Sequence, residues 1–232
     1  MVDIVIRDVP RRDLPEAAEM LAGSLGFGVR DSIPPWVMLT TTEAGGLAIG
    51  AYRGARLVGF SYALPALVQG RAELFSCGLA VAERERGHGI GRRLKLAQRD
   101  RAVARGIPVI RWTADPLAAP ALRLYLSRLG AELVGYRSGL FAGLRAHAVP
   151  QDDVEIVWDL GAARRAEPPG ADAIDVDIPA DVRRLVPRTA TQWRRRARRL
   201  MTALLDDGFV GTAVDREPRG DRCRVRFVRE SP

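Results

Sequence analysis

The chain has 232 residues, of which 47% are hydrophobic and 28% are charged, values typical of a globular protein that buries a core. No apolar run reaches the roughly 18 residues that a membrane-spanning helix needs, and two unspaced cysteines argue against a disulfide framework or a metal site. The net charge of +8 invites a nucleic-acid interpretation, but nearly every positive charge is an arginine and these are spread along the whole chain, which favours a diffuse surface suited to a polyanionic small molecule.

The first part of the chain predicts alternating strands and helices. A period-2 pattern opens the sequence without a signal-type apolar segment, so we expect a cytoplasmic protein. Pro15 suits the first turn of a helix, and Arg53-Gly54-Ala55-Arg56 reads as a hairpin turn between two apolar stretches. The expected elements are a strand at 2–7, helices at 13–25 and 32–45, and strands at 47–52 and 57–64.

The most informative segment begins with a strand-like stretch at 74–81, which runs into a turn with glycines at 87, 89 and 91 and then into an amphipathic helix at 92–105. Glycines at such a turn let an anion approach backbone N–H groups at the positive end of the helix dipole, which predicts a phosphate or diphosphate ligand. The spacing matches neither a P-loop nor the Gly-x-Gly-x-x-Gly dinucleotide pattern. The alternative is a glycine-rich turn that merely opens an ordinary helix.

The rest of the chain predicts a mixed sheet followed by an extension. The composition changes after residue 160 to a stretch rich in Ala, Gly and Pro, which reads as a linker or exposed loop at 161–175. A helix at 189–205 carries an arginine run at 194–199, which could hold a carboxylate or phosphate but reads more simply as a solvated basic face. The remaining expected elements are a strand at 108–113, a helix at 118–129, strands at 131–136 and 154–160, and a hairpin of strands at 210–214 and 223–228.

Two motifs at the right spacing resemble the GNAT superfamily of acyl-CoA-dependent N-acyltransferases. Arg86, Gly89 and Gly91 match the Arg/Gln-x-x-Gly-x-Gly/Ala pattern of motif A, and the segment 121–130 resembles motif B. In motif B, Tyr125 and Gly130 are kept, whereas alanine replaces both the usual asparagine at 118 and the usual aromatic residue at 131. A wider similarity, covering nearly the whole chain, is to a poorly characterised bacterial branch of this superfamily that has a C-terminal extension. Members of that branch usually carry His in place of Cys77 and Asn in place of Tyr125.

The resemblance implies an α/β fold with a mixed sheet, the GNAT acyltransferase fold with a C-terminal helix and hairpin. It divides the chain into a GNAT domain at 1–160, a linker at 161–177 and the extension at 178–232. It also implies acetyl-CoA or another acyl-CoA, such as succinyl-CoA, as co-substrate. The expected cofactor-binding residues are Leu79, Ala80 and Val81 on the strand, and Arg86, Gly87, His88, Gly89, Ile90, Gly91 and Arg92 in the turn and helix.

The catalytic residues are predicted less sharply. Tyr125 is the expected general acid for the departing thiolate, and its alternative role is to pack motif B against the sheet. Glu73 and Cys77 lie four residues apart, hence on one face of a strand, and are the candidates for a base acting through water. Cys77 has two alternative roles: it could form an acyl-cysteine intermediate, or it could be a small thiol of the core. Of these two we favour the core thiol. Trp112 and Asp115 are the expected substrate-binding residues, although Asp115 also suits the N-terminus of the following helix.

The function that these features predict is direct transfer of an acyl group from CoA to the primary amine of a small molecule, such as an amino acid. Three alternatives stay open: a non-catalytic acyl-CoA-binding or regulatory module, a nucleic-acid-binding protein that uses the helix at 189–205, and an acyl-group lyase on the same fold. The expected partner is the amine acceptor, with a homodimer left open and neither membrane nor nucleic acid expected.

Overall fold

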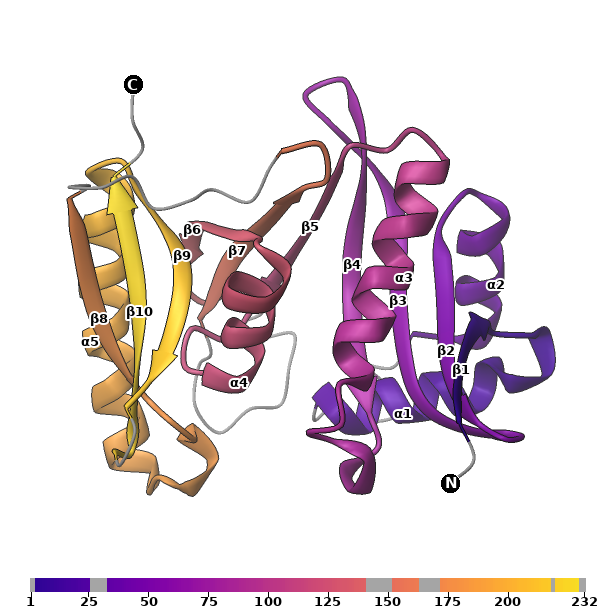
Figure 1. Ribbon diagram of the computed structural model, residues 1–232, viewed down its shortest axis with the longest axis horizontal. Coiled ribbons are helices and arrows are strands. Elements are labelled where there is room, and N and C mark those ends of the chain that lie inside the picture. The colour runs from indigo at the N-terminus through magenta and orange to yellow at the C-terminus, as the bar shows by residue number, and fades with distance from the viewer. Residues whose placement is uncertain (1–2, 26–32, 141–151, 163–171, 218–219, 230–232) are drawn as a thin grey trace. The chain divides into compact units, whose positions relative to one another are not determined.

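The computed structural model describes residues 3–25, 33–140, 152–162, 172–217 and 220–229 (Figure 1). The chain forms two compact units, Met1–Arg111 and Trp112–Pro232, each of which contains strands and helices. Strand β5 (Val109–Ala114) carries the chain from the first unit into the second. Most of the sequence-predicted elements are present, so the expected mixed α/β fold is confirmed.

In the first unit the strands follow the order β1-β2-β3-β4-β5. Neighbours are antiparallel except β4 and β5, which pair in parallel at Leu74–Ile110 and Phe75–Arg111. The strands are β1 (Ile4–Asp8), β2 (Leu47–Arg53), β3 (Arg56–Val68) and β4 (Arg71–Val81), and the helices are α1 (Leu14–Leu25), α2 (Pro35–Glu43) and α3 (Ile90–Ala104).

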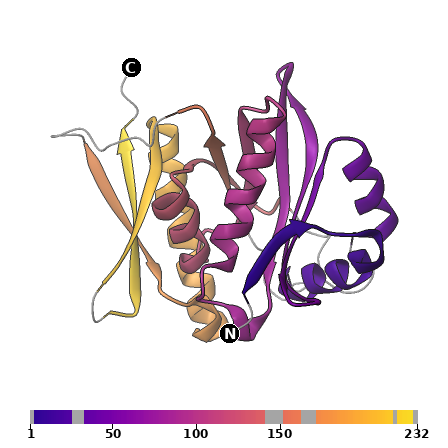
Figure 2. The ribbon, with the colours of Figure 1, turned by 45° about the vertical axis from the view of Figure 1, so that its right-hand side comes forward.

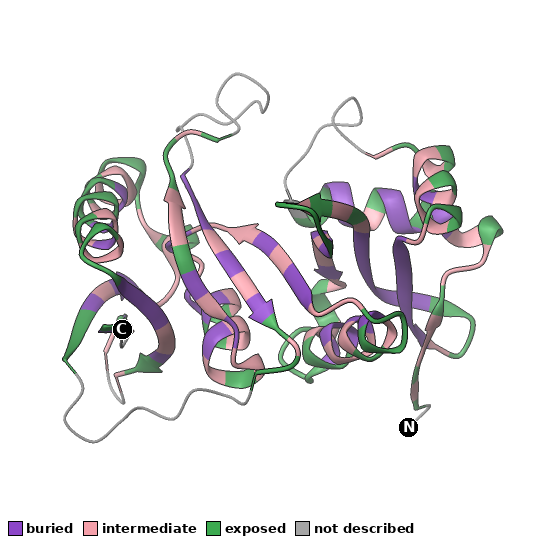
Figure 3. Ribbon diagram, turned by 90° about the horizontal axis from the view of Figure 1, so that it is seen from above, coloured by how far each residue is buried: buried purple, intermediate pink, exposed green. Residues whose placement is uncertain are grey.

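Helices cover both faces of this sheet, with α3 on one face and α1 and α2 on the other (Figures 1 and 2). Strand β2 and the first half of β3 are therefore almost completely buried (Figure 3). Glycines permit the close approach on each side: a Cβ at Gly78 would overlap with Leu21 of α1, and one at Gly59 would lie 3.0 Å from Ile90 of α3.

Strand β4 contains an irregularity where it pairs with β3. Ala63 lies opposite Ser76 and Tyr62 lies opposite Gly78, so Cys77 is an extra residue on β4, a β-bulge. A bulge interrupts the alternation of side chains, and it changes the direction in which the following residues of the strand point.

In the second unit the strands follow the order β7-β6-β9-β10-β8, and all of these pairs are antiparallel. A helical segment packs on β9, where the Ser127 hydroxyl accepts from the N–H of Val214 at 2.8 Å and donates to its C=O at 3.1 Å. The strands are β6 (Glu132–Arg137), β7 (Asp153–Asp159), β8 (Ala173–Pro179), β9 (Phe209–Arg216) and β10 (Arg222–Arg229), and the long helix is α5 (Pro187–Asp206).

Three local features differ from the sequence prediction. Helix α3 begins at Ile90, two residues earlier than expected, so the glycine turn leads directly into it. The helix expected at 118–129 is α-helical only in α4 (Ala119–Leu122) and continues as a π-helix, Arg123–Leu129. Strand β8 starts inside the stretch expected to be a loop, where Ile174-Asp175-Val176-Asp177-Ile178 alternates in a strand pattern and pairs with β10.

Candidate functional site

The turn after β4 leads into a helix N-terminus without a side-chain cap. After a short 3-10 segment, Glu83–Glu85, the chain passes through Gly87 and Gly89, whose φ angles are +83° and +79°. Glycine adopts this left-handed backbone at little cost, and a Cβ at either position would meet no atom within 4 Å. The first N–H groups of a helix lack intrahelical acceptors, and no described side chain caps α3 at Gly89. These amides fit the diphosphate of a nucleotide-bearing ligand.

Arg86 and the end of β4 border this turn. The Nε of Arg86 donates to the C=O of Val81 at 3.0 Å, which holds the exposed guanidinium beside the glycines. Residues 79–81 of β4 pair with β3 at Ser61, Phe60 and Gly59, beyond the parallel pairing of Leu74 and Phe75 with β5. The structure thus brings together the turn and strand residues that the sequence predicted. Ile90 contributes only its backbone, because its side chain is buried.

Glu73 is held by an arginine that the sequence did not single out. Its carboxylate accepts from Arg111 Nε at 2.5 Å and from Arg111 Nη2 at 3.1 Å, and the Glu73 side chain is 5% exposed. This bidentate pair fixes the carboxylate in place and occupies both of its oxygens. Arg111 reaches Glu73 because β5 pairs in parallel with β4. This pairing cannot be predicted from local sequence patterns, so no signal in the sequence points to Arg111.

Cys77, the bulged residue, lies on the same face of β4 as Glu73. Ser76 faces α3, where it contacts Lys95, whereas Cys77 packs against the core formed with α1 and α2. Burial raises the pKa of the Cys77 thiol to about 11, with the backbone near Leu64 and the charge of Lys95 acting weakly in the other direction. The thiol is therefore protonated near neutral pH and is a poor nucleophile.

We accordingly expect no acyl-cysteine. Mixing the protein with acetyl-CoA alone should leave its intact mass unchanged, because a protonated, buried thiol does not attack a thioester. Cys77→Ser should keep most of the acyl-transfer activity. A stable adduct on Cys77 in the mass spectrum, lost together with turnover in Cys77→Ser, would contradict direct transfer.

A buried lysine lies beneath the bulge, and it is the only lysine in the sequence. Lys95 Nζ donates to Ser76 Oγ at 2.9 Å and to Gln98 Oε1 at 3.2 Å, and Gln98 Nε2 donates to Ser61 Oγ at 3.1 Å. The side chains of Lys95 and Gln98 are almost fully buried. Burial lowers the pKa of Lys95 to about 7. This polar network ties α3 to β3 and β4, directly behind the candidate ligand turn.

The lowered pKa predicts a specific pH dependence of stability. Between pH 7 and pH 10.5 the unfolded chain binds a proton at Lys95 that the folded protein does not, so the free energy of unfolding rises with pH. Cys77 acts oppositely between pH 9 and pH 11, where only the unfolded thiol loses its proton. Between pH 7 and about 8.5, urea unfolding should show a gain of at most about 1.4 kcal/mol per pH unit from Lys95. The Lys95→Met variant is the control and should lack this slope; an equal slope in both proteins would contradict the assignment.

Tyr125 belongs to an aromatic cluster in the second unit. Its ring meets the buried Trp112 edge-on with centroids 5.1 Å apart, and Trp112 meets Trp158 at 6.4 Å. Burial raises the pKa of the Tyr125 hydroxyl to about 12, so the phenol is protonated at neutral pH and has a proton to donate. Tyr125 lies in the π-helix, a local form that is frequent at functional sites. These contacts are compatible with Tyr125 as the general acid and also with Tyr125 as a residue that packs motif B against the sheet.

Asp115 is bound by the arginine run of the extension. Its carboxylate accepts from Arg194 Nη1 and Nη2, each at 2.9 Å, and from the N–H of Leu117 at 2.9 Å. Arg198, one turn later on α5, forms a second bidentate pair with the buried Asp152 at 2.9 and 2.6 Å. Arg194 and Arg198 are therefore structural partners of acids, and the simple picture of a solvated basic face holds only for the exposed Arg195, Arg196 and Arg199.

In the part of the chain that the structure describes, no group of three or more His, Cys, Asp and Glu residues is arranged to hold a metal ion. Among the described helices, none combines the length and the apolar character needed to span a membrane.

Comparisons with known proteins agree with this geometry. Residues 16–131 match the sequence model of the acetyltransferase (GNAT) family. The chain is structurally similar to ribosomal-protein-S18-alanine N-acetyltransferase from Escherichia coli, at 18% identity over 69% of this chain and 96% of that one, with a TM-score of 0.54. It is similar to yncA from Salmonella typhimurium, solved with its cofactor acetyl-CoA, at 16% identity over 72% and 99% of the chains, with a TM-score of 0.57.

A third similar structure is Naa50 from Arabidopsis thaliana in complex with the bisubstrate analogue CoA-Ac-MVNAL, at 19% identity over 68% of this chain and 99% of that one, with a TM-score of 0.55. At such low identities the likeness concerns the fold alone. A comparison with curated protein sequences gives no match.

Proposed function

Because the chain belongs to the GNAT family of acetyltransferases, we propose that it transfers an acyl group, acetyl or succinyl, from CoA to the primary amine of a small molecule such as an amino acid. The observation that carries the proposal is the uncapped N-terminus of α3 behind Gly87 and Gly89, in the turn that follows the end of β4. The yncA structure contains acetyl-CoA, which supports the same class of donor here.

In this proposal the amides of residues 87–92 and the Arg86 guanidinium bind the diphosphate. The backbone of residues 79–81 pairs with the pantetheine arm as an added strand would, and its amides polarise the thioester carbonyl. Holding both reactants together supplies up to about 7–11 kcal/mol of the rate acceleration.

The chemical step forms a C–N bond and breaks the C–S bond. The neutral amine attacks the thioester carbon, its surplus proton passes to water or a base, and the departing thiolate takes a proton from Tyr125. An α-amine with a pKa near 8 is already partly neutral at physiological pH, so a weak base suffices. Because Arg111 holds both oxygens of Glu73, we propose that Glu73 acts as a base through water. Asp115 and Trp112 are the further predicted substrate contacts, and Asp115 is where the substrate ammonium would approach.

The proposal keeps the expected division of the chain into an acyltransferase domain at 1–160 and an extension at 178–232, with β8 beginning inside the connecting stretch. Since acyl-CoA and free amino acids are cytoplasmic metabolites, it also places the reaction in the cytoplasm.

The donor site can be tested with a matched pair of glycine variants. Gly89→Leu should abolish CoA binding measured by calorimetry, because a side chain would stand where the anion approaches the amides. Gly54 has a similar φ of +63° and equally open surroundings, so Gly54→Leu introduces comparable backbone strain far along the sequence from the turn and should bind CoA normally. Arg86→Ala should weaken CoA binding by only about 1–3 kcal/mol, since several amides remain.

Equal affinities in folded Gly89→Leu and wild type would contradict the assignment of the turn. A thiol-release assay with several acyl-CoAs and amines then separates enzyme from binding module: a module binds CoA at this turn and releases no thiol with any acceptor.

A further inference from the structure

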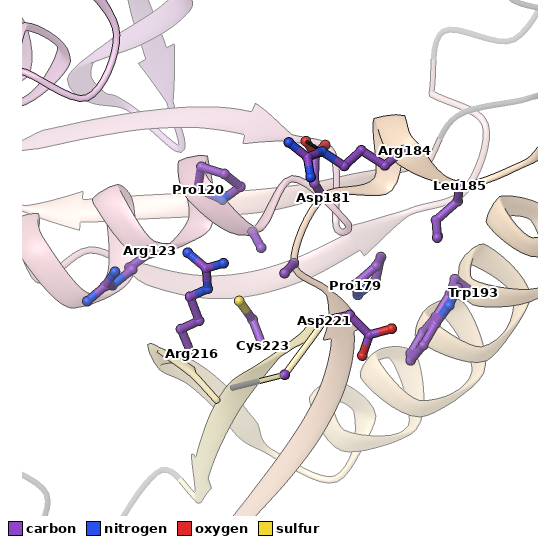
Figure 4. Close-up of a pocket in the computed structure, with 13 residues that line it drawn as sticks. Pro120, Arg123, Pro179, Asp181, Arg184, Leu185, Trp193, Arg216, Asp221 and Cys223 are labelled. Carbon is purple, nitrogen blue, oxygen red and sulfur yellow. Dashed lines mark ion pairs between the residues drawn. The ribbon is translucent and has the colours of Figure 1, made fainter. Parts of the chain in front are cut away.

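The second unit contains a cavity that acyl transfer does not use. Its volume is about 710 Å³, and all thirteen residues that line it lie between Ala119 and Cys223 (Figure 4). The walls come from the ends of β8, β9 and β10, the helix at 119–129, the 3-10 segment Val182–Arg184 and α5. Most of this lining belongs to the C-terminal extension, for which the proposed function has no role.

One end of the cavity is cationic. Arg123 and Arg216 both line the cavity at the end where the buried Cys223 lies (Figure 4). Burial raises the pKa of Cys223, while the charges of Arg216 and Arg123 act to lower it and that of Glu217 to raise it. Two guanidinium groups at one end of a cavity favour an anionic ligand there.

Several arginines of this unit, among them Arg184 in the cavity lining, are paired with carboxylates. Arg184 pairs with Asp181 at 3.6 Å, Arg222 with Asp177 at 3.5 Å, and Arg226 with Asp175 at 3.1 Å. Arg123 and Arg216, by contrast, have no ion pair within 4.0 Å to any residue that the structure describes. Their charges are available to a ligand.

The other end of the cavity contains the aromatic ring of Trp193, over which the guanidinium groups of Arg196 and Arg222 lie at 5.6 and 5.7 Å. Trp193 of α5 and Leu185 lie far from the arginine pair in the view of Figure 4, with Pro179 between them and the centre. Two carboxylates also reach the lining, but Asp181 is already engaged by Arg183 and Arg184, and the side chain of Asp221 is 95% exposed.

We propose that this cavity binds a small organic anion, with its carboxylate or phosphate on the Arg123–Arg216 pair and its planar, apolar body toward Trp193. Arginine pairs bind such groups through charge-assisted hydrogen bonds, and aromatic side chains favour planar ligands. Most ligand cavities combine an apolar wall with a few convergent polar groups in this way, at volumes of about 300–1,000 Å³.

The site is distinct from the acyl-transfer chemistry. Arg123 and Tyr125 are two positions apart on one helix and so point to different sides of it. The Tyr125 ring packs on Trp112, which is not among the residues that line the cavity. A ligand held by Arg123 therefore lies on the side of this helix away from the proposed general acid.

The test uses calorimetry on the full chain with phenyl phosphate, benzoate, inorganic phosphate and the neutral benzyl alcohol. We expect saturable binding of phenyl phosphate or benzoate and none of benzyl alcohol; the preferred anion identifies the ligand as phosphate or carboxylate. Arg123→Gln combined with Arg216→Gln should weaken binding by about 100-fold, about tenfold for each charge-assisted contact. Trp193→Leu should weaken phenyl phosphate by about three- to tenfold and leave inorganic phosphate unchanged.

The matched control combines Arg195→Gln with Arg199→Gln, which removes the same charge from exposed positions of α5 outside the cavity and should leave binding unchanged. Melting curves confirm that each variant folds. The proposal is overturned if no anion binds, if benzyl alcohol binds as well as phenyl phosphate, or if the two double variants behave alike. Displacement of phenyl phosphate by saturating CoA would also overturn it, whereas binding retained in Gly89→Leu would support it whatever happens to acyl transfer.

Discussion

Replacing Tyr125 by phenylalanine should lower the rate of acyl transfer by about 10²–10⁴-fold, the usual cost of losing a general acid. The substitution keeps the ring that packs on Trp112 and removes only the hydroxyl. Because burial raises the pKa of that hydroxyl to about 12, the proton is present across the physiological range, and the loss should be similar at every pH between about 6 and 9. The affinity for CoA should change little, since the predicted diphosphate contacts come from residues 86–92.

Two controls separate this role from simple packing. Acyl donors with more acidic thiols should partly rescue Tyr125→Phe, because their leaving groups need less protonation. If Tyr125 only packs against the cluster of Trp112 and Trp158, turnover at saturation stays near normal and the loss appears in the melting curve instead. A Tyr125→Phe enzyme with full turnover would mean that water protonates the thiolate.

The sequence predicts the turn between β4 and α3 because its signals are local. Glycines at 87 and 89 are needed for the left-handed turn, and the apolar period predicts the following helix, although not its first two residues. The polar network of Lys95, Gln98, Ser61 and Ser76 also has a signal in the sequence. Lys95 and Gln98 fall on the same helical face as the buried Ile90 and Leu94, and a lone lysine there is unusual in a chain otherwise rich in arginine.

The sequence does not predict features that depend on residues far apart in the chain. The extra residue at Cys77 is defined only by the pairing of β4 with β3, and the Arg111–Glu73 pair only by that of β4 with β5. Strand β8 does alternate, with Ile174, Val176 and Ile178 between Asp175 and Asp177, but it follows directly on a stretch rich in Ala, Gly and Pro that reads as a loop. Its two aspartates pair with arginines of β10, which lies far along the chain. The π-helix likewise follows from packing on β9, because nothing in its residue types distinguishes it from an α-helix.

The second prediction of a large effect concerns the stability that the ion pair between Asp115 and Arg194 provides. These two residues are 79 positions apart in the sequence. Both side chains are mostly buried, at 24% and 10% exposure, and four atoms take part in two bonds of 2.9 Å. Burial disfavours the charge of Arg194, but the hydrogen bonds that it donates to Asp115 and the charge of that carboxylate outweigh burial, so the pKa of Arg194 is raised. Removing one partner of such a pair leaves a buried charge uncompensated.

Asp115→Ala should therefore lower the free energy of unfolding by about 3–5 kcal/mol, measured by urea denaturation. Arg194→Met should lower the free energy of unfolding by less. The methionine side chain replaces the apolar stem of the arginine, and only the more exposed Asp115 is left unpaired. The double variant should be more stable than Asp115→Ala alone, since no buried charge then remains, and this non-additivity is the signature of direct pairing. Arg195→Met on the exposed face of α5 is the matched control and should change stability by less than about 0.5 kcal/mol. The structural role of Asp115 is contradicted if Asp115→Ala lowers the free energy of unfolding no more than this control, or if the effects of the two single variants simply add. In that case Asp115 does not hold α5, and its loss should instead raise the KM for the amine, as its predicted substrate role requires.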